Sequence, residues 1–254
     1  MSHPEYNFEG KVALITGASG GIGSAVAELL GLAGSRVFIA GTREDKLNQL
    51  ASQLRARSIE CSRLALDITA PGAPARLVDA AAKEWGRLDI LVNAAGINRP
   101  QKAEEVSEEN WDAIFNINLR ALFLVSQVAG RKMIDQGYGR IVNISSQTGK
   151  VAIPLRAAYC SSKAAVDALT RSLALEWAPY NVTINAVAPT FVETPFVSEM
   201  FKDADFMSYV LDSIPLGRMA TAQEVAHAVL YLASDHAAIV TGHVLLVDGG
   251  WTIK

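Results

Sequence analysis

Tyr159 and Lys163 are the residues of this chain whose types and spacing point most directly to chemistry. They stand four positions apart in the segment AAYCSSKAAVDAL, a spacing that stacks both side chains on one face of a helix. A tyrosine hydroxyl titrates near pH ~10, so it serves as an acid or base at neutral pH only where something nearby favours the phenolate. A lysine ammonium one turn away does so. The pair is a candidate proton-handling centre, although the same spacing also marks the amphipathic edge of many helices.

The elements that must position this pair follow from the pattern of apolar residues. Short apolar runs rich in β-branched residues predict strands at 12–16, 36–40, 89–96, 140–146, 182–189 and 243–250. Between them, apolar residues at i, i+3 and i+4 predict helices at 25–34, 46–56, 75–86, 110–137, 163–179 and 222–235. Strands that are apolar on both faces and alternate with helices predict a doubly wound α/β fold with a parallel β-sheet. No linker or repeat divides the chain, so residues 1–254 are expected to form a single domain.

Composition narrows the class of partner. The chain has 254 residues, 50% of them hydrophobic, and a net charge of -3. A mildly acidic chain without a basic run argues against nucleic acid and against a membrane as partners, so a small-molecule ligand is expected. The two cysteines and four histidines lack the spacing of metal ligands, which predicts a site without metal. Neither a signal peptide nor a charge-free apolar stretch of about 18 residues is apparent, so a cytoplasmic protein is expected.

A glycine-rich turn follows the first predicted strand. The strand at 12–16 leads directly into Gly17, Gly20, Gly21 and Gly23, and a helix follows. Glycine permits the tight turn and the close approach of a pyrophosphate to backbone N–H groups at the N-terminus of a helix. The turn reads G-x-x-x-G-x-G rather than G-x-G-x-x-G, and its place in the first βα unit predicts dinucleotide binding.

One long stretch lacks a clean period. Residues 191–218 carry seven large apolar or aromatic side chains without helical or strand spacing: Phe191, Phe196, Met200, Phe201, Phe206, Met207 and Tyr209. Such a stretch fits a cover over a pocket, and it fits an ordinary pair of surface helices equally well.

Together these motifs resemble the short-chain dehydrogenase/reductase family over nearly the whole chain. The segment TGASGGIG at 16–23 resembles the TGxxxGxG loop of that family, and NAAG at 93–96 resembles its strand-stabilising motif. Asp67 is similar to the acid that contacts adenine, and Asn118 in FNINL is similar to the catalytic asparagine. Ser146 lies thirteen residues before Tyr159, as the serine of the family does, so Ser145 is the weaker candidate. The resemblance implies a Rossmann fold and NAD(P)-dependent transfer of hydride between an alcohol and a carbonyl.

The resemblance also implies roles for individual residues. Tyr159 would exchange a proton with the substrate oxygen, and Ser146 would bind that oxygen. Lys163 would lower the pKa of the tyrosine and bind the nicotinamide ribose, and Asn118 would hold a water that links the lysine to solvent. The implied cofactor contacts are Gly17, Ser19, Gly21, Ile22, Gly23, Thr42, Arg43, Asp67, Ile68, Asn93, Ala94, Gly96, Tyr159, Lys163, Pro189, Val192 and Thr194.

The end of the predicted second strand indicates which cofactor is preferred. An acid there would bond the ribose of NAD, whereas an arginine would accept the 2'-phosphate of NADP. Gly41 stands where relatives that prefer NAD usually have Asp, and Thr42 and Arg43 can donate to a phosphate. NADP is therefore predicted, with NAD as the alternative. Glu44 and Asp45 would repel a phosphate if they pointed inward, and Asp45 is expected to cap the following helix instead.

The sequence says less about the substrate. Thr190 replaces the glycine that usually follows the equivalent of Pro189, and it is expected to narrow the pocket or to offer a hydroxyl to the substrate. Arg156 could bind a carboxylate, phosphate or sulfonate, or could be a surface arginine. A sugar, polyol or sugar acid is predicted, with Ser146, Arg156, Tyr159 and Thr190 as substrate contacts.

Two alternative functions stay open. A 3-oxoacyl-carrier-protein reductase is one, although Gly137 and Leu175 stand where such enzymes carry carrier-docking arginines. A nucleotide-sensing protein that lost catalysis is the other, because a fold does not guarantee a function.

The family resemblance further implies a homotetramer, through the helices around 107–135 and 158–178, and Trp251 is predicted to anchor a second subunit contact.

Overall fold

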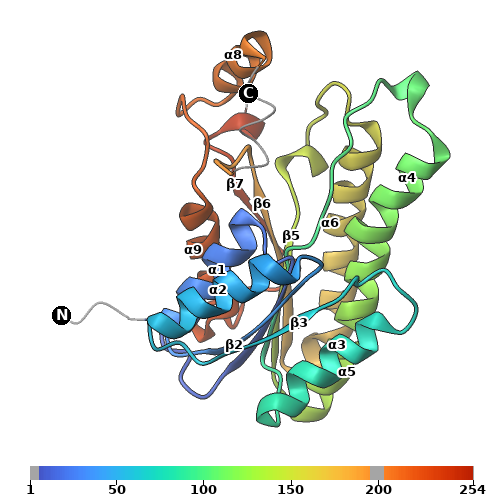
Figure 1. The fold of residues 1–254 in the computed structure, drawn as a ribbon. Helices are drawn as coiled ribbons and strands as arrows, with labels where there is room; N and C mark the ends of the chain where they lie inside the picture. The colour runs from blue at the N-terminus through green and yellow to red at the C-terminus, as the bar shows by residue number, and fades with distance from the viewer. Residues whose placement is uncertain (1–5, 195–202, 254) are drawn as a thin grey trace.

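The computed structural model describes residues 6–194 and 203–253, and within these ranges the chain forms a seven-stranded parallel sheet. The strand order is β3-β2-β1-β4-β5-β6-β7, so the direction of winding reverses between β1 and β4 (Figure 1). The strands are β1 Val12–Thr16, β2 Arg36–Gly41, β3 Cys61–Ala65, β4 Ile90–Asn93, β5 Gly139–Ile144, β6 Val182–Pro189 and β7 Val244–Val247. This is the doubly wound Rossmann-like fold that the sequence predicts.

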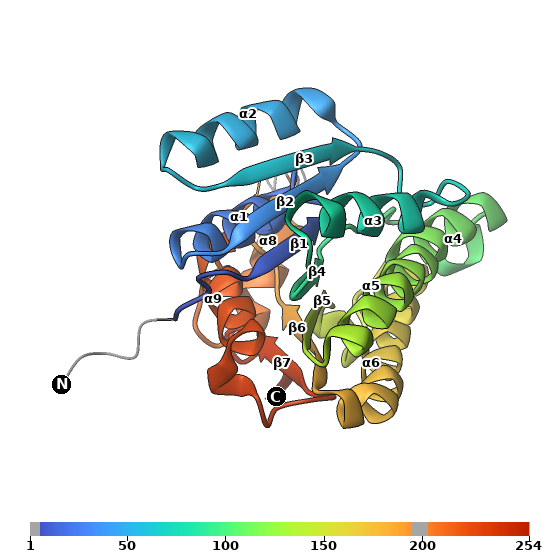
Figure 2. The ribbon, with the colours of Figure 1, turned by 90° about the horizontal axis from the view of Figure 1, so that it is seen from below.

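Helices cover both faces of the sheet. The chain's main helices are α1 Gly21–Leu32, α2 Glu44–Ala56, α3 Ala73–Trp85, α4 Glu108–Phe115, α5 Leu122–Gln136, α6 Ala157–Trp177, α8 Ala204–Ser213 and α9 Ala222–Ala233. Figure 2 shows α1, α2 and α9 on one face and α3, α5 and α6 on the other. Every residue of β1, β4, β5 and β6 is buried, as expected for strands covered on both sides. Each fully buried large aliphatic side chain contributes about 1.5–3 kcal/mol to stability.

Two elements differ from the sequence prediction. The edge strand β3 was not predicted, because its sequence CSRLA is half polar and four of its five residues are only partly buried. The helix predicted at 110–137 is interrupted by a π-helical turn at Asn116–Ala121, between α4 and α5. The whole stretch Glu108–Gln136 is long and apolar enough to cross a membrane, yet Val125, Ala129 and Met133 pack into the core beneath the sheet.

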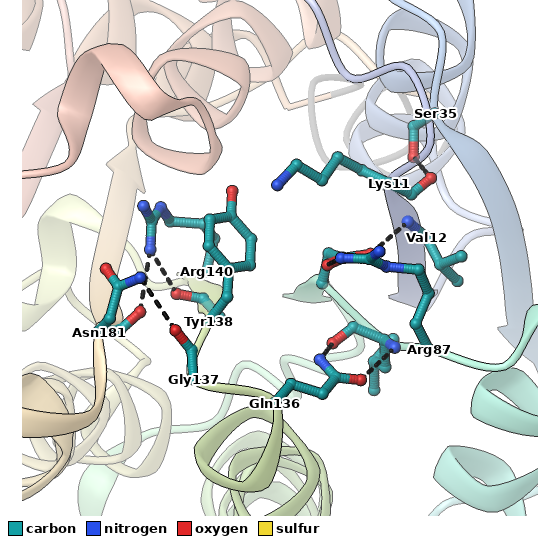
Figure 3. Close-up of polar contacts among 12 residues, drawn as sticks. Lys11, Val12, Ser35, Arg87, Gln136, Gly137, Tyr138, Arg140 and Asn181 are labelled. Atoms are coloured by element: carbon teal, nitrogen blue, oxygen red, sulfur yellow. Dashed lines mark hydrogen bonds and ion pairs between the residues drawn. The ribbon is translucent and has the colours of Figure 1, made fainter.

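A polar network closes the end of the sheet where the parallel strands begin (Figure 3). Asp89, which is fully buried, accepts hydrogen bonds from the backbone N–H of Val12 and from the Arg87 guanidinium. The buried Arg140 donates to the carbonyl of Asn181, and its guanidinium lies 4.3 Å from the centre of the Tyr138 ring. These contacts satisfy backbone and charged groups that would otherwise be buried alone. The polar residues at this end of the sheet therefore stabilise the fold. The opposite end is available for a functional site.

The stretch predicted to cover a pocket lies at that opposite end. Within its described part, α8 sits above the ends of β6 and β7, close to the C-terminal residues (Figure 1). Val210 and Ile214 pack with Trp251 in a small apolar cluster, against which Phe191 and Phe206 lie. Trp251 is 7% exposed and packs within its own chain, and its predicted role at a subunit contact stays a prediction. The predicted residues Phe196, Met200 and Phe201 lie outside the described residues.

Candidate active site

A cavity of about 660 Å³ opens at the ends of the strands, where the winding reverses between β1 and β4. Parallel α/β sheets bind ligands at this point. Most of the predicted site residues line the cavity: Gly17, Gly21, Ile22, Gly23, Arg43, Ala94, Gly96, Ser146, Arg156, Tyr159, Lys163, Pro189, Thr190, Val192 and Thr194. Six predicted residues are not part of the lining found among the described residues: Ser19, Thr42, Asp67, Ile68, Asn93 and Asn118.

The glycine-rich turn packs too tightly for side chains. Gly17 has a φ of +65°, and a Cβ there would lie 2.6 Å from the backbone nitrogen of Ala95. A Cβ on Gly23 would lie 2.5 Å from the carbonyl oxygen of Gly17. Gly20 precedes α1 in an extended conformation and cannot cap the helix with a side chain, so no side chain of the N-cap residue occupies the first N–H groups of α1. Those N–H groups and the helix dipole suit a pyrophosphate.

Arg43 joins the glycine turn to the start of α2. Its Nη2 donates to the carbonyl oxygen of Ser19 at 2.8 Å, and the guanidinium is exposed at the cavity rim. A Cβ on Gly41 would lie 3.0 Å from the Ser19 hydroxyl, which leaves little room for an acid at the end of β2. Glu44 pairs with Arg63 instead of facing the rim. Arg43 itself occupies the N-cap position of α2, so the predicted cap at Asp45 is wrong.

Asp67 and Ile68 follow β3 at the far side of this rim. Asp67 is exposed, and its Oδ1 accepts from the backbone N–H of Thr69 at 2.8 Å and from the Thr69 hydroxyl at 2.7 Å. Ile68 is buried in the core beneath the sheet. The two residues form a turn near the rim of the cavity. The predicted contact of Asp67 with adenine stays a prediction.

Tyr159 and Ser146 both line the cavity. Tyr159 lies in the first turn of α6, and Ser146 follows β5 in an extended conformation that begins a short 3-10 turn at Gln147–Gly149. Burial raises the pKa of the Tyr159 phenol above its ordinary value, and the hydrogen bond with Ser146 and the charge of Arg156 offset only part of that rise. Tyr159 is therefore a neutral phenol at pH 7 in this structure, ready to donate a proton.

Lys163 lies one turn along α6 from Tyr159, with its ammonium in the interior. Its Nζ donates to the carbonyl oxygen of Ile144 at 2.9 Å, and it lies 5.6 Å from the centre of the Tyr159 ring. A Cβ on Gly96 would lie 3.6 Å from Lys163 Nζ and 3.3 Å from the Asn118 Oδ1. The ammonium and the Asn118 amide thus flank the same glycine, at the floor of the cavity.

Ser145 and Asp167 form a second pair behind the first. The Ser145 hydroxyl donates to Asp167 Oδ1 at 2.6 Å, so this hydroxyl is committed to α6 rather than to a ligand. Asp167 is 2% exposed, and burial raises the pKa of its carboxyl. Burial lowers the pKa of Lys163 to about 8, against the charge of Asp167, which acts to raise it. The Asp167 carboxylate therefore supports the charged state of Lys163 from one turn away.

Asn118 lies on the π-helical turn at Asn116–Ala121 and is fully buried. Its Oδ1 accepts from the backbone N–H of Ile97 at 2.8 Å, and its Nδ2 donates to the Ile97 carbonyl oxygen and to the Ser162 hydroxyl. Turns of π-helix often occur at functional sites because they re-aim one side chain out of the regular helical path. In this structure the Asn118 amide fixes the loop after β4 to α6.

Asn93 serves the sheet rather than the cavity. Its Nδ2 donates to the Ser126 hydroxyl and to Asn143 Oδ1, both at 2.9 Å. Asn143 in turn donates to the Thr170 hydroxyl, so the chain of hydrogen bonds joins β4, β5 and two helices inside the core. This agrees with the strand-stabilising role implied for NAAG. Asn93 itself is not among the residues that line the cavity.

The segment after β6 closes the remaining wall. The methyl group of Thr194 would lie 2.5 Å from a Cβ on Gly21, so this segment reaches across to the glycine turn. Val192 bridges to Ala220. Thr190 replaces the usual glycine without strain, because among the described residues only three non-glycines have a positive φ and Thr190 is not one of them. Its hydroxyl is buried and makes no hydrogen bond within the described chain.

With this geometry established, comparison with known proteins identifies the family. A family model described as "Enoyl-(Acyl carrier protein) reductase" matches residues 17–252. An NAD-dependent glycerol dehydrogenase from Listeria innocua is 39% identical over 251 residues, which cover 98% of this chain and 97% of that protein. The chain belongs to the short-chain dehydrogenase/reductase family. The resemblance predicted from the glycine turn and the Ser, Tyr and Lys set is confirmed.

Two further short-chain dehydrogenase/reductase relatives bear on the function. A 3-oxoacyl-acyl-carrier-protein reductase from Thermotoga maritima is 39% identical over 245 residues, covering 96% of this chain and 99% of that protein. The structure of a candidate NAD(P)-dependent gluconate 5-dehydrogenase from Beutenbergia cavernae, which contains NADP at low occupancy, superposes with a TM-score of 0.94. The two chains are 36% identical, and the match covers 98% of this chain and 100% of the other.

Sequence reasoning missed three polar residues that shape this short-chain dehydrogenase/reductase site. Gln147 and Thr148 line the cavity and are nearly fully buried, and Asp167 supports Lys163 from behind. Gln147 and Thr148 directly follow Ser146, and Asp167 lies four residues after Lys163 on the same helix face, so spacing alone could have indicated all three. Within residues 6–194 and 203–253, no three His, Cys, Asp or Glu side chains are grouped to hold a metal ion.

Proposed function

We propose that this chain is an NADP(H)-dependent oxidoreductase that interconverts a secondary alcohol and a carbonyl on a sugar, polyol or sugar acid. The observation that carries the proposal is that Tyr159, Ser146 and Lys163 line the same cavity as the glycine turn. A phenol and a hydroxyl on the wall of one cavity can bind the same carbonyl oxygen. The glycine turn provides the place for a dinucleotide beside them.

The proposed mechanism assigns one task to each residue. The nicotinamide, when bound, supplies or accepts the hydride. Ser146 holds the substrate oxygen, and the neutral Tyr159 phenol donates its proton to that oxygen during reduction or recovers it during oxidation. The positive charge of Lys163 stabilises the phenolate that Tyr159 becomes, and its ammonium is placed to bind the nicotinamide ribose. Asn118 fixes the loop that carries Ile97 and so keeps this wall of the cavity in place.

NADP is the cofactor that the rim of the cavity favours. Arg43 is exposed there, and Gly41 leaves no acid at the end of β2 to bond a ribose 2'-hydroxyl. An arginine guanidinium pairs with a phosphate through two parallel N–H donors. Glu44 is not among the lining residues and forms an ion pair with Arg63 at 3.8 Å. NAD remains the alternative, since the glycerol dehydrogenase relative is NAD-dependent by name.

A polar substrate fits the far end of the cavity better than an acyl chain does. Beyond Tyr159 the wall carries Gln147, Thr148, Arg156 and Thr190, which offer amide, hydroxyl and guanidinium groups. A long acyl chain would leave these groups buried and unpaired, at a cost of about 1–3 kcal/mol for each. The relatives include an acyl-carrier-protein reductase as well as polyol and gluconate dehydrogenases, so a reductase of 3-oxoacyl thioesters is the second candidate.

The test is absorbance at 340 nm with NADPH and, in parallel, NADH. The panel contains ketoses, keto acids, sulfonated carbonyls, diketones and an acetoacetyl thioester, with matching alcohols for the oxidative direction. We expect turnover with NADPH and a polyhydroxylated carbonyl. Turnover confined to the thioester would favour the second candidate, and binding of NADPH without turnover of any substrate would favour a nucleotide-sensing protein.

We further propose a cytoplasmic homotetramer. Large apolar side chains are exposed on two helices of the outer layer and at the C-terminus, where Trp111 is 41%, Leu175 82% and Ile253 83% exposed. Exposed apolar groups of this size favour contact with another copy of the chain. Light scattering coupled to size-exclusion chromatography tests the tetramer, and cell fractionation tests the location.

A further inference from the structure

Arg156 is an uncompensated buried cation at the substrate end of the cavity. It is 5% exposed, it lines the cavity beside Tyr159, and no carboxylate of the described residues pairs with it. Burial lowers the pKa of its guanidinium, yet arginine stays protonated at neutral pH. A buried charge without a partner is costly, so such groups persist in proteins where something binds to them.

The loop before α6 holds this guanidinium in place. Leu155 adopts a φ of +64°, which is unfavourable for a branched side chain, and its carbonyl oxygen accepts from the backbone N–H of Gln101 at 2.9 Å. The Arg156 Nη1 donates to the Pro154 carbonyl oxygen at 3.0 Å, and the guanidinium lies 5.0 Å from the centre of the Phe206 ring. These contacts orient the group but use only one of its five N–H donors. Strained backbone that is held by its surroundings is typical of functional sites.

The neighbouring wall contains further polar atoms without partners. Both ends of the Gln147 amide, the Thr148 hydroxyl and the Thr190 hydroxyl are buried and make no hydrogen bond within the part of the chain that the structure describes. All three residues are more than nine-tenths buried, and all three line the same cavity as Arg156. Buried polar atoms in native proteins normally have partners, so this wall has hydrogen-bonding capacity that the described chain does not use.

We propose that the substrate is a polyhydroxy carboxylic acid whose carboxylate binds Arg156 and whose hydroxyl groups bind Gln147, Thr148 and Thr190. The inference rests on the proposed function and narrows it from sugars and polyols in general to their acids. A single carboxylate matches a single free guanidinium, because the planar group offers two parallel donors to it. Arg99 also lines the cavity, but it is exposed and already donates to Asn110 at 2.6 Å, so it adds no second buried charge for a phosphate.

The experiment compares acids with alditols that differ from them only at one carbon. The pairs are D-gluconate with D-glucitol, D-threonate with D-threitol, and glycerate with glycerol, each oxidised with the preferred cofactor. We expect kcat/KM for at least one acid to exceed that of its alditol by about 10- to 100-fold, as for a charge-assisted bond. Arg156→Gln should lower kcat/KM for the acid by a similar factor more than it lowers kcat/KM for the alditol, and mainly through KM.

Two further variants separate recognition from structure. Arg156→Lys keeps the charge without the planar pair of donors and should retain part of the preference. Arg99→Gln removes the exposed arginine of the same cavity and should leave the ratio of acid to alditol within about 3-fold. A merely structural role for Arg156 predicts that Arg156→Gln lowers both members of a pair equally, and that result would overturn the inference.

Binding measurements keep this inference distinguishable from the proposed function. Calorimetry on Tyr159→Phe, loaded with the oxidised cofactor, reports binding without turnover. Acids that bind more tightly than alditols, and lose this advantage in the Arg156→Gln double variant, would support the carboxylate site even if the wild-type enzyme oxidised nothing on the panel. Turnover of alditols with no preference for any acid would leave the oxidoreductase standing and overturn the carboxylate site. Failure of every acid both to bind and to react would overturn it too.

Discussion

Asp167 lies one helical turn beyond Lys163 on α6, and its carboxylate is held by the Ser145 hydroxyl at 2.6 Å rather than by the Lys163 ammonium. The carboxylate nevertheless acts on the lysine through its charge. Burial favours neutral Lys163 and the negative charge of Asp167 opposes it, and the net result is a pKa lowered to about 8. Lysine is charged below its pKa, so the proposed chemistry depends on Asp167 near the upper end of the physiological range.

The pH dependence of activity tests this relationship. In the wild type, the rate of NADPH-dependent reduction should fall as the pH rises through about 8, because Lys163 loses its proton there. Asp167→Asn removes the charge that raises the pKa of Lys163, so the fall should begin at a lower pH. Ser145→Ala is the matched control, since it removes the hydrogen bond and keeps the charge. An identical alkaline limb in Asp167→Asn and the wild type would contradict the coupling.

Tyr159→Phe should abolish proton transfer and leave the cofactor site intact. General acid–base catalysis contributes about 10²- to 10⁴-fold, so kcat should fall by at least about 100-fold. The affinity for NADPH, followed by its fluorescence, should stay within about 2-fold, because the glycine turn that suits the pyrophosphate lies before α1 and the phenol lies on α6. A nucleotide-sensing protein would instead keep all its cofactor-dependent behaviour in this variant.

Arg43→Asp tests the cofactor preference. Replacing the exposed guanidinium by a carboxylate should weaken NADPH by about 10-fold or more, since a charge-assisted bond is lost and a like charge is introduced. NADH should be unaffected or should bind better. Arg63→Asp is the control for a general change of charge on this side, because Arg63 is engaged with Glu44. Equal weakening of NADH and NADPH by Arg43→Asp would mean that Arg43 only supports the Ser19 carbonyl.

Asn118→Ala should destabilise the protein as well as the site. The substitution leaves the N–H and carbonyl of Ile97 and the Ser162 hydroxyl without their partner, which should lower the free energy of unfolding by about 2 kcal/mol or more. Asn116→Ala is the control on the same turn, because the Asn116 amide accepts only from the exposed Arg120 at 3.3 Å, and it should cost less than about 0.5 kcal/mol. Urea unfolding of both variants measures the difference.

The features that sequence could predict are those governed by local patterns. Alternating apolar runs and helical periods identify the sheet and its two helical layers, and the fixed spacing from Ser146 through Tyr159 to Lys163 identifies the site, which the fold brings into one cavity. The half-polar edge strand β3 could not be predicted from apolar runs, because an edge strand needs fewer apolar residues than a central strand. The π turn could not be predicted either, because its sequence NINLRA keeps the apolar spacing of a continuous helix.

Features that depend on packing between distant segments could not be read in this way. The burial of Trp251 depends on α8 and on Ile153, which are remote in sequence. The partnership of Ser145 with Asp167, and the isolation of Arg156 from any described carboxylate, are likewise tertiary relationships. For Tyr159, the sequence predicts a phenolate favoured by Lys163, whereas in this structure burial raises its pKa and only Ser146 and Arg156 act to lower it.

The π turn at Asn116–Ala121 gives this segment an unusual sensitivity to length. A π turn is equivalent to one residue inserted into an α-helix, and each α-helical residue rotates the path by about 100°. Deleting Ile117 would remove the extra residue and let α4 and α5 continue as one regular helix. The amide of Asn118 would then swing away from Ile97. Loss or gain of a single codon here would thus change the active site and spare the fold, and it would keep the reading frame. An active enzyme and an inactive relative could diverge by this one step.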